Sequence, residues 1–171
     1  MSRPKTRKPD DSSIRRALRR GWSHREPVLW AVIVVLAVTV RWPILKGWYY
    51  GETGAAAPAS AVAWRTDLAG ALVEARTAHK GVLVDFSASW CPPCIAMKHE
   101  VWPDAEVARA INAGYVPVAV DADNSHGLSE RYNVDNLPTV LLLDADGRVA
   151  KRNEGYLPTS GVLRLLADAS R

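Results

Sequence analysis

With 171 residues and a net charge of +4, the chain has room for one ordinary domain plus a tail, and its charge suggests a nucleic acid or a membrane as partner. The charge is segregated, because residues 1–27 carry nine Lys or Arg against three acids, whereas residues 51–171 carry eleven against fifteen. An acidic C-terminal part lacks the attraction to phosphate that supplies most nonspecific affinity for nucleic acids, so a nucleic-acid-binding protein is excluded.

The N-terminal part divides into a tail and an apolar segment. Residues 1–26 are basic and polar, and they bury too little apolar surface to repay the ordering of the chain. An unbroken apolar run follows in residues 28–40. A bilayer core needs about 20 apolar residues in a helix, so we expect a transmembrane helix over residues 27–47, with Arg41 snorkelling to the interface. The nearby aromatic side chains suit the boundary between water and lipid: Trp42, Trp48, Tyr49 and Tyr50.

Two alternatives to this anchor are a cleaved signal peptide and a buried core helix. An A-x-A sequence at residues 59–61 resembles a signal-peptide cleavage site, but it lies about twenty residues past the apolar run. Positive charges before the run outnumber Arg41 and Lys46 after it, which places the N-terminus in the cytoplasm and the rest of the chain outside it. Disulfides persist in such a compartment.

The remaining chain predicts a linker and one globular domain. The linker covers residues 48–61, which are rich in Gly, Ala and Pro, and the domain covers residues 62–171. The domain begins with a helix from about residue 68, with Asp67 as its N-cap and Gly81 as its stop, and a buried strand over residues 82–86. The next elements are a helix from Cys-Pro-Pro-Cys, a helix over 104–113, a strand over 115–120, a helix over 125–132, strands over 139–143 and 148–151, and a helix over 160–169. This order predicts an α/β fold, a mixed sheet with helices on both faces.

The chain contains two cysteines, Cys91 and Cys94, which stand too close together to close a long loop. At a helix start, residues i and i+3 share one face, so the two sulfurs can reach bonding distance while the first lies at the positive end of the helix dipole. Pro92 suits the first helical position, because its missing N–H would have no intrahelical partner. We therefore expect Cys91 to be the more acidic and accessible nucleophile and Cys94 the resolving thiol.

Half of a zinc site is the structural alternative for Cys-x-x-C. Structural zinc takes four Cys or His ligands, and the chain adds only histidines without paired spacing: His24, His79, His99 and His126. The sequence therefore predicts no metal, and it has no fingerprint for NAD or flavin. With no cofactor expected, the electrons for a redox reaction would come from an upstream redox protein.

Three sequences resemble the signature of the thioredoxin family: Val84-Asp85-Phe86, ASWCPPC at residues 88–94, and Leu137-Pro138-Thr139. The resemblance covers about residues 62–170 and implies a thioredoxin-like fold behind the N-terminal helix. Residues 97–102 and 104–111 are most similar to periplasmic thioredoxin-like domains such as the C-terminal domain of the disulfide reductase DsbD. This likeness agrees with a single-pass protein of a bacterial inner membrane whose domain lies in the periplasm.

The resemblance also implies roles for individual residues. A cis bond before Pro138 would let the backbone at Leu137 bind a substrate strand beside the disulfide, the alternative being an ordinary trans proline. Asp85 corresponds to a buried carboxylate behind Cys94 that accepts and returns a proton, with a pKa raised by desolvation; the alternative is a surface acid. Trp90 is expected to shield the disulfide or to pack in the core. Trp102 and His99 are expected to be packing or surface residues.

These expectations predict a membrane-anchored thiol–disulfide oxidoreductase whose partners are protein thiols and disulfides. The reductase direction is favoured, because the two prolines remove backbone donors near Cys91 and leave the reduced thiolate less stabilised. A disulfide oxidase or isomerase stays open, and so does a non-catalytic module that binds peptides on a thioredoxin fold.

Overall fold

The computed structural model describes residues 25–169, so the tail predicted over residues 1–26 lies outside the described residues except at its last two positions. The chain divides into two units, Met1–Trp42 and Pro43–Arg171. The second unit contains every strand and helix of the globular fold together with the end of the N-terminal helix.

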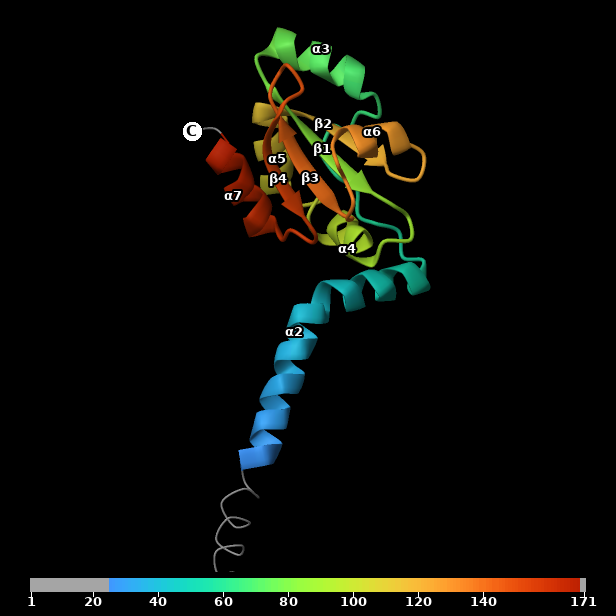
Figure 1. Cartoon of the computed structure of the whole chain (residues 1–171), viewed down its shortest axis with the longest axis vertical. Coiled ribbons are helices and arrows are strands. Elements are labelled where there is room, and N and C mark those ends of the chain that lie inside the picture. The colour runs from blue at the N-terminus through green and yellow to red at the C-terminus, as the bar shows by residue number, and fades with distance from the viewer. Residues whose placement is uncertain (1–24, 170–171) are drawn as a thin grey trace, which may run out of the picture. The chain divides into compact units, whose positions relative to one another are not determined.

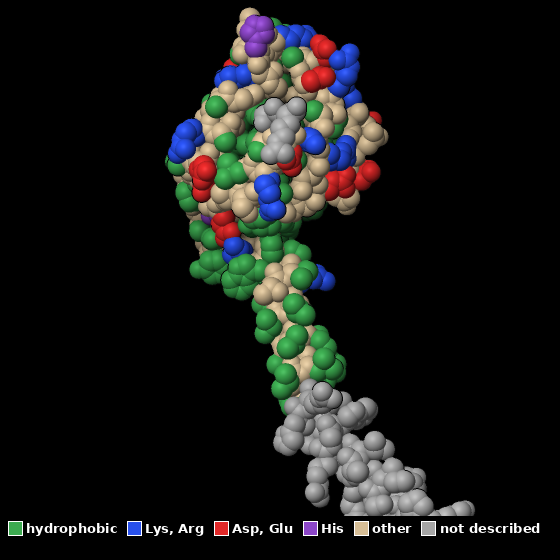
Figure 2. Space-filling view, turned by 90° about the vertical axis from the view of Figure 1, so that its left-hand side faces the viewer, with side chains coloured by type: hydrophobic (Ala, Val, Ile, Leu, Met, Phe, Trp, Pro, Cys, Tyr) green, Lys and Arg blue, Asp and Glu red, His purple; other side chains and the backbone are tan. Residues whose placement is uncertain are grey.

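Helix α2 (Arg25–Thr53) carries the apolar run. An 18-residue stretch of its span Pro27–Thr53 has a mean hydropathy of 2.3, and none of that stretch is buried, so the buried-helix alternative is wrong. Figure 2 shows apolar side chains along this helix. By length and composition it is the one helix among residues 25–169 that could cross a membrane, and a signal sequence shares these properties.

Helix α2 continues beyond residue 47, through part of the stretch predicted as a linker, and ends at Thr53. Gly54 follows with a φ of 60°, a left-handed conformation that glycine adopts without steric cost at the end of a helix. Residues 55–64 have neither helix nor strand, and Arg65 then forms an isolated bridge with Val118.

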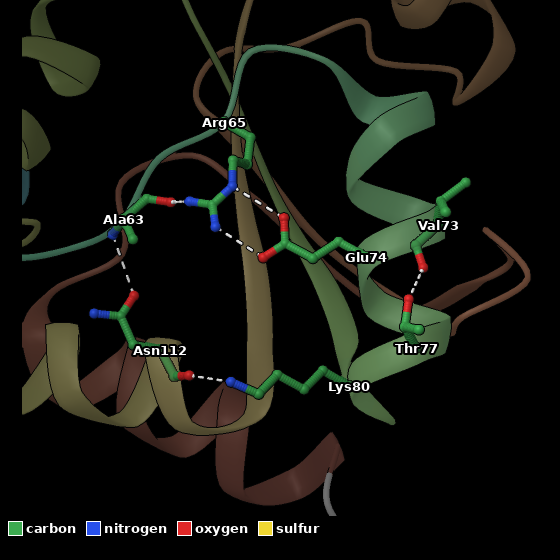
Figure 3. A network of polar contacts seen from close by, with 7 residues as sticks. All are labelled: Ala63, Arg65, Val73, Glu74, Thr77, Lys80 and Asn112. Atoms are coloured by element: carbon green, nitrogen blue, oxygen red, sulfur yellow. Dashed lines mark hydrogen bonds and ion pairs between the residues drawn. The ribbon is translucent and has the colours of Figure 1, made fainter.

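Polar contacts hold residues 63–65 against the domain (Figure 3). The guanidinium of Arg65 donates to both carboxylate oxygens of Glu74, at 3.1 and 2.8 Å, and its backbone N–H donates to Pro117 at 2.8 Å. The backbone N–H of Ala63 donates to the amide oxygen of Asn112 at 3.2 Å. Residues 63–65 therefore lie along the outer edge of the sheet.

The sheet contains four strands in the order β2-β1-β3-β4. Strand β1 (Gly81–Ser87) pairs in parallel with β2 (Tyr115–Asp121) and antiparallel with β3 (Thr139–Leu143), and β3 pairs antiparallel with β4 (Val149–Glu154). The parallel pair requires a crossover, which α4 (Pro92–Glu100) and α5 (Ala105–Gly114) provide. The mixed sheet predicted from the sequence is confirmed.

Capping residues set the helix boundaries. Asp67 accepts hydrogen bonds from Ala69 and Gly70 at the start of α3 (Leu68–Ala78), which confirms the predicted cap. The prediction that Gly81 stops this helix was wrong, because His79 already ends it in a left-handed conformation with φ 54°. Gly81 is instead the first residue of β1.

Alternating side chains give the sheet two apolar cores, each covered by helices (Figure 1). On the face that we call the α3 face, Val82, Val84 and Phe86 pack with α3 and with Tyr132, which follows α6 (His126–Arg131). On the opposite face, the α4 face, Leu83 packs with residues of α4, α5 and α7 (Thr159–Ala169). Asp85 shares the parity of Leu83 and therefore belongs to the α4 face.

Candidate active site

The two cysteines lie at the junction between β1 and α4. Cys91 is the N-cap of α4, and Pro92 and Pro93 occupy the first helical positions. The sulfur of Cys91 accepts a hydrogen bond from the backbone N–H of Cys94 at 3.3 Å. The two residues form a disulfide with their Cα atoms 5.3 Å apart. The expected location at a helix start is thus confirmed.

In this oxidised state neither cysteine is exposed. Cys91 is 2% exposed and Cys94 is 5% exposed, and both pack with Ala88 and the half-buried Leu137. The prediction that Cys91 is the more accessible of the two was wrong for this state. The sequence contained no signal for this burial, because Leu137 lies far from the cysteines in the chain and meets them only in the fold.

The loop before β3 carries the cis bond that the resemblance implied, between Leu137 and Pro138. Two hydrogen bonds hold this loop: the buried Thr139 hydroxyl donates to the carbonyl of Asn136 at 2.7 Å, and the backbone N–H of Gly155 donates to the carbonyl of Pro138 at 2.7 Å. Leu137, which lies in this loop, packs against the cysteine pair.

Asp85 is buried on the α4 face, with 6% of its surface exposed, so the surface-acid alternative is wrong. Burial disfavours its charged form and raises its pKa from 3.8 to about 7, while a hydrogen bond from the Trp102 side chain lowers it in part. Asp85, Cys94 and Trp102 line the same cleft of about 670 Å³, and Lys98 and His99 line it as well. A buried acid with a pKa near neutrality can exchange a proton with a group in its cleft.

The sequence analysis missed the contacts of two residues in this site. Trp102 is buried, which confirms the expectation that it packs, but the hydrogen bond from its side chain to Asp85 was not predicted. The second is Asp123, whose carboxylate accepts a hydrogen bond from the indole of Trp90 at 2.9 Å. Trp90 itself is 65% exposed, so its core alternative is wrong. Because the tryptophan side chain is mostly apolar, the sequence indicated packing or shielding for Trp90 and Trp102. It gave no sign of the hydrogen bonds that the two side chains make.

Comparisons with known proteins agree with the thioredoxin resemblance of the sequence. Residues 68–170 match the family described as thioredoxin-like domains. A thioredoxin of Mycoplasmoides gallisepticum is 32% identical over 88 residues, which cover 52% of this chain and 83% of that protein. The thiol:disulfide interchange protein DsbD of Salmonella paratyphi A is 30% identical over 137 residues, 76% of this chain but 23% of that protein. The solution structure of a Thermus thermophilus thioredoxin, 27% identical, has a TM-score of 0.59 and covers 64% of this chain and 88% of its own.

Proposed function

Because this chain belongs to the family of thioredoxin-like domains, and is a thiol–disulfide oxidoreductase with a redox cysteine pair, we propose that it reduces protein disulfides outside the cytoplasm while anchored by α2. The observation that carries the proposal is the Cys91–Cys94 disulfide at the start of α4, with the buried Asp85 in the cleft that Cys94 lines.

The first half of the reaction forms a mixed disulfide. In the reduced protein, the thiolate of Cys91 attacks one sulfur of a substrate disulfide, and the other substrate sulfur leaves as a thiolate. Cys91 is the nucleophile because it caps α4, where the positive end of the helix dipole stabilises its negative charge. Leu137 packs against the pair, Pro138 follows it through the cis bond, and Trp90 directly precedes Cys91; these three residues would hold the substrate backbone.

The second half releases the substrate. The thiol of Cys94 gives its proton to the carboxylate of Asp85 and attacks the sulfur of Cys91, so the second substrate sulfur leaves as a thiolate. The pair loses two electrons, the substrate gains two, and Asp85 passes the proton to the second substrate thiolate. The product is the disulfide seen in the structure, and a donor redox protein restores the dithiol by the reverse exchange.

The reductase direction is supported by the residues between the cysteines. Pro92 and Pro93 offer no N–H groups to a thiolate at Cys91, and a less stabilised thiolate gives a more reducing pair. We expect a reduction potential near that of thioredoxin, about −270 mV, when the full chain is equilibrated with glutathione buffers. A potential near about −120 mV would identify an oxidase instead.

The location is supported by the positive charges before the apolar run and by the exposed apolar surface of α2. A reporter fused after Arg171 that works only outside the cytoplasm should be active. Activity of a reporter that works only inside the cytoplasm would overturn this part of the proposal. Recovery of a shortened, soluble protein would show that α2 is a cleaved signal sequence.

A further inference from the structure

The end of helix α2, residues 43–53, has two different faces within the second unit. Pro43, Lys46, Gly47 and Tyr50 are buried or half-buried, and their spacing of three and four residues places them on one side of the helix. We call this side the inner face. Four large apolar residues between them are exposed and form what we call the outer face: Ile44, Leu45, Trp48 and Tyr49.

The inner face meets the first turn of the active-site helix directly. A Cβ atom on Gly47 would overlap the carbonyl group of Pro92, so the backbones of the two helices touch at this point. One turn further on, a Cβ atom on Gly51 would lie at an ordinary contact distance of 3.6 Å from the side chain of Ile95. Gly47 therefore permits an approach that any larger residue would prevent.

Polar and aromatic contacts hold the inner face at the other end of α4. Lys46 forms an ion pair with Glu100, and the hydroxyl of Tyr50 donates to the same carboxylate at 3.2 Å. The Tyr156 hydroxyl reaches Glu100 at 3.4 Å, which adds a contact from the chain after β4. The ring of Tyr50 stacks on His99 with the centroids 4.2 Å apart and the planes 2° apart. Contacts at both ends fix how residues 43–53 lie on α4.

The outer face has the chemistry of a helix that lies at a lipid surface. Trp48 and Tyr49 are 63% and 61% exposed, and both residue types concentrate at the boundary between water and lipid. The segment also continues without a break from the apolar part of α2, which ends with the first unit at Trp42. Glu52, exposed near the end of the helix, limits how deeply the segment can enter.

We propose that residues 43–53 form an interfacial helix, with the outer face in the lipid headgroup layer and the inner face holding α4. The start of α4, and with it Cys91, is then held at the membrane surface. This inference rests on the proposed anchoring by α2, and it adds that the catalytic domain does not move freely at the end of a linker.

The proposal can be tested with the full chain, labelled with 5-fluorotryptophan, in nanodiscs of phosphatidylcholine and phosphatidylglycerol. The Trp30, Trp48 and Trp102 signals are assigned by single Trp→Phe substitutions. A nitroxide deep in the acyl chains should broaden Trp30, and a nitroxide on the headgroup should broaden Trp48 more strongly than the buried Trp102.

The outcomes separate the inference from the proposed function. If Trp30 is broadened but Trp48 is not, the anchor stands and the interfacial helix is overturned. If neither signal is broadened by either label, the anchor itself fails. If Trp48 is shielded from aqueous quenchers but unaffected by both labels, a second copy or another protein covers the outer face, and the lipid assignment is wrong.

A matched pair of glycine variants tests the contact with α4. The substrate is a disulfide peptide attached to the nanodisc lipid by a short or a long tether. Wild-type protein and Gly51→Ala should prefer the short tether, whereas Gly47→Ala, which forces the segment away from Pro92, should lose that preference severalfold. The same tether preference in both variants would overturn the claim that the inner face holds Cys91 near the membrane.

Discussion

The two faces of the central sheet are built from the same strands but differ in what they bury. On the α3 face, β1 contributes Val82, Val84 and Phe86 to a core of apolar side chains. On the α4 face, Leu83 is followed at the next equivalent position by Asp85, beside a cleft that reaches Cys94. Burying an ionisable group is costly, so the α4 face is less stable at the position where the proposed mechanism uses a proton acceptor.

The largest expected effect on stability comes from the α3 face. Leu141 is fully buried there, opposite Val84 on β1, and Leu141→Ala should lower the free energy of unfolding by about 2–5 kcal/mol. Exchange activity per folded molecule should stay the same, because the cleft lies on the other face. Urea unfolding followed by activity in zero denaturant checks both parts. A changed reduction potential in this variant would break the separation of the two faces.

Asp85 should make the stability of the protein depend on pH. Its pKa is 3.8 ordinarily and about 7 in the fold, so between these values the folded chain holds a proton that the unfolded chain has released. Stability should therefore fall as the pH rises from about 4 to about 7, by up to roughly 4 kcal/mol. Asp85→Asn should remove this slope and be the more stable protein at pH 8. Parallel slopes in denaturant titrations of the two proteins would contradict the burial argument.

The same variant should be slower in chemistry. Asp85→Asn keeps the size of the side chain but cannot accept the proton of Cys94, so release of the mixed disulfide should slow about 10²-fold near neutral pH. Formation of the mixed disulfide by Cys91 should be less affected. Stopped-flow measurement of the two steps distinguishes them, and an unchanged release rate would remove Asp85 from the mechanism.

A smaller effect is expected from Trp102. Its side chain lowers the pKa of Asp85 by hydrogen bonding, so Trp102→Phe should move the pH profile of mixed-disulfide release to higher pH. Trp64→Phe is the matched control, because Trp64 lines the same cleft and packs edge-on against Trp102 at 5.4 Å. Equal profiles for both variants would assign Trp102 to packing alone.

Local patterns were sufficient to predict the elements of the domain and the pairing of its cysteines. The apolar run at residues 82–86, the cap Asp67 and the helix start at Cys91 act over a few residues, and the structure has all of them. The cis bond at Pro138 and the raised pKa of Asp85 came from the family resemblance, and they are also confirmed.

Contacts between distant parts of the chain could not be predicted in the same way. The burial of Cys91 depends on Leu137, the bond from Trp90 depends on Asp123, and the contact at Pro92 depends on Gly47. The stretch assigned to a linker shows the same limit, because residues 48–53 are helical in a segment whose inner face rests on α4. Each of these features is set by tertiary packing, which leaves little trace in neighbouring residues.

The division of labour between the two sulfurs is the central claim, and trapping in Cys91→Ser and Cys94→Ser variants of the full chain tests it most directly. Cys94→Ser should accumulate mixed disulfides through Cys91 that disappear on non-reducing gels after added dithiol, because the resolving thiol is missing. Cys91→Ser should form none and lose exchange activity. Partners trapped by Cys91→Ser instead would reverse the two roles, and two variants that trap nothing while retaining activity would contradict the oxidoreductase mechanism.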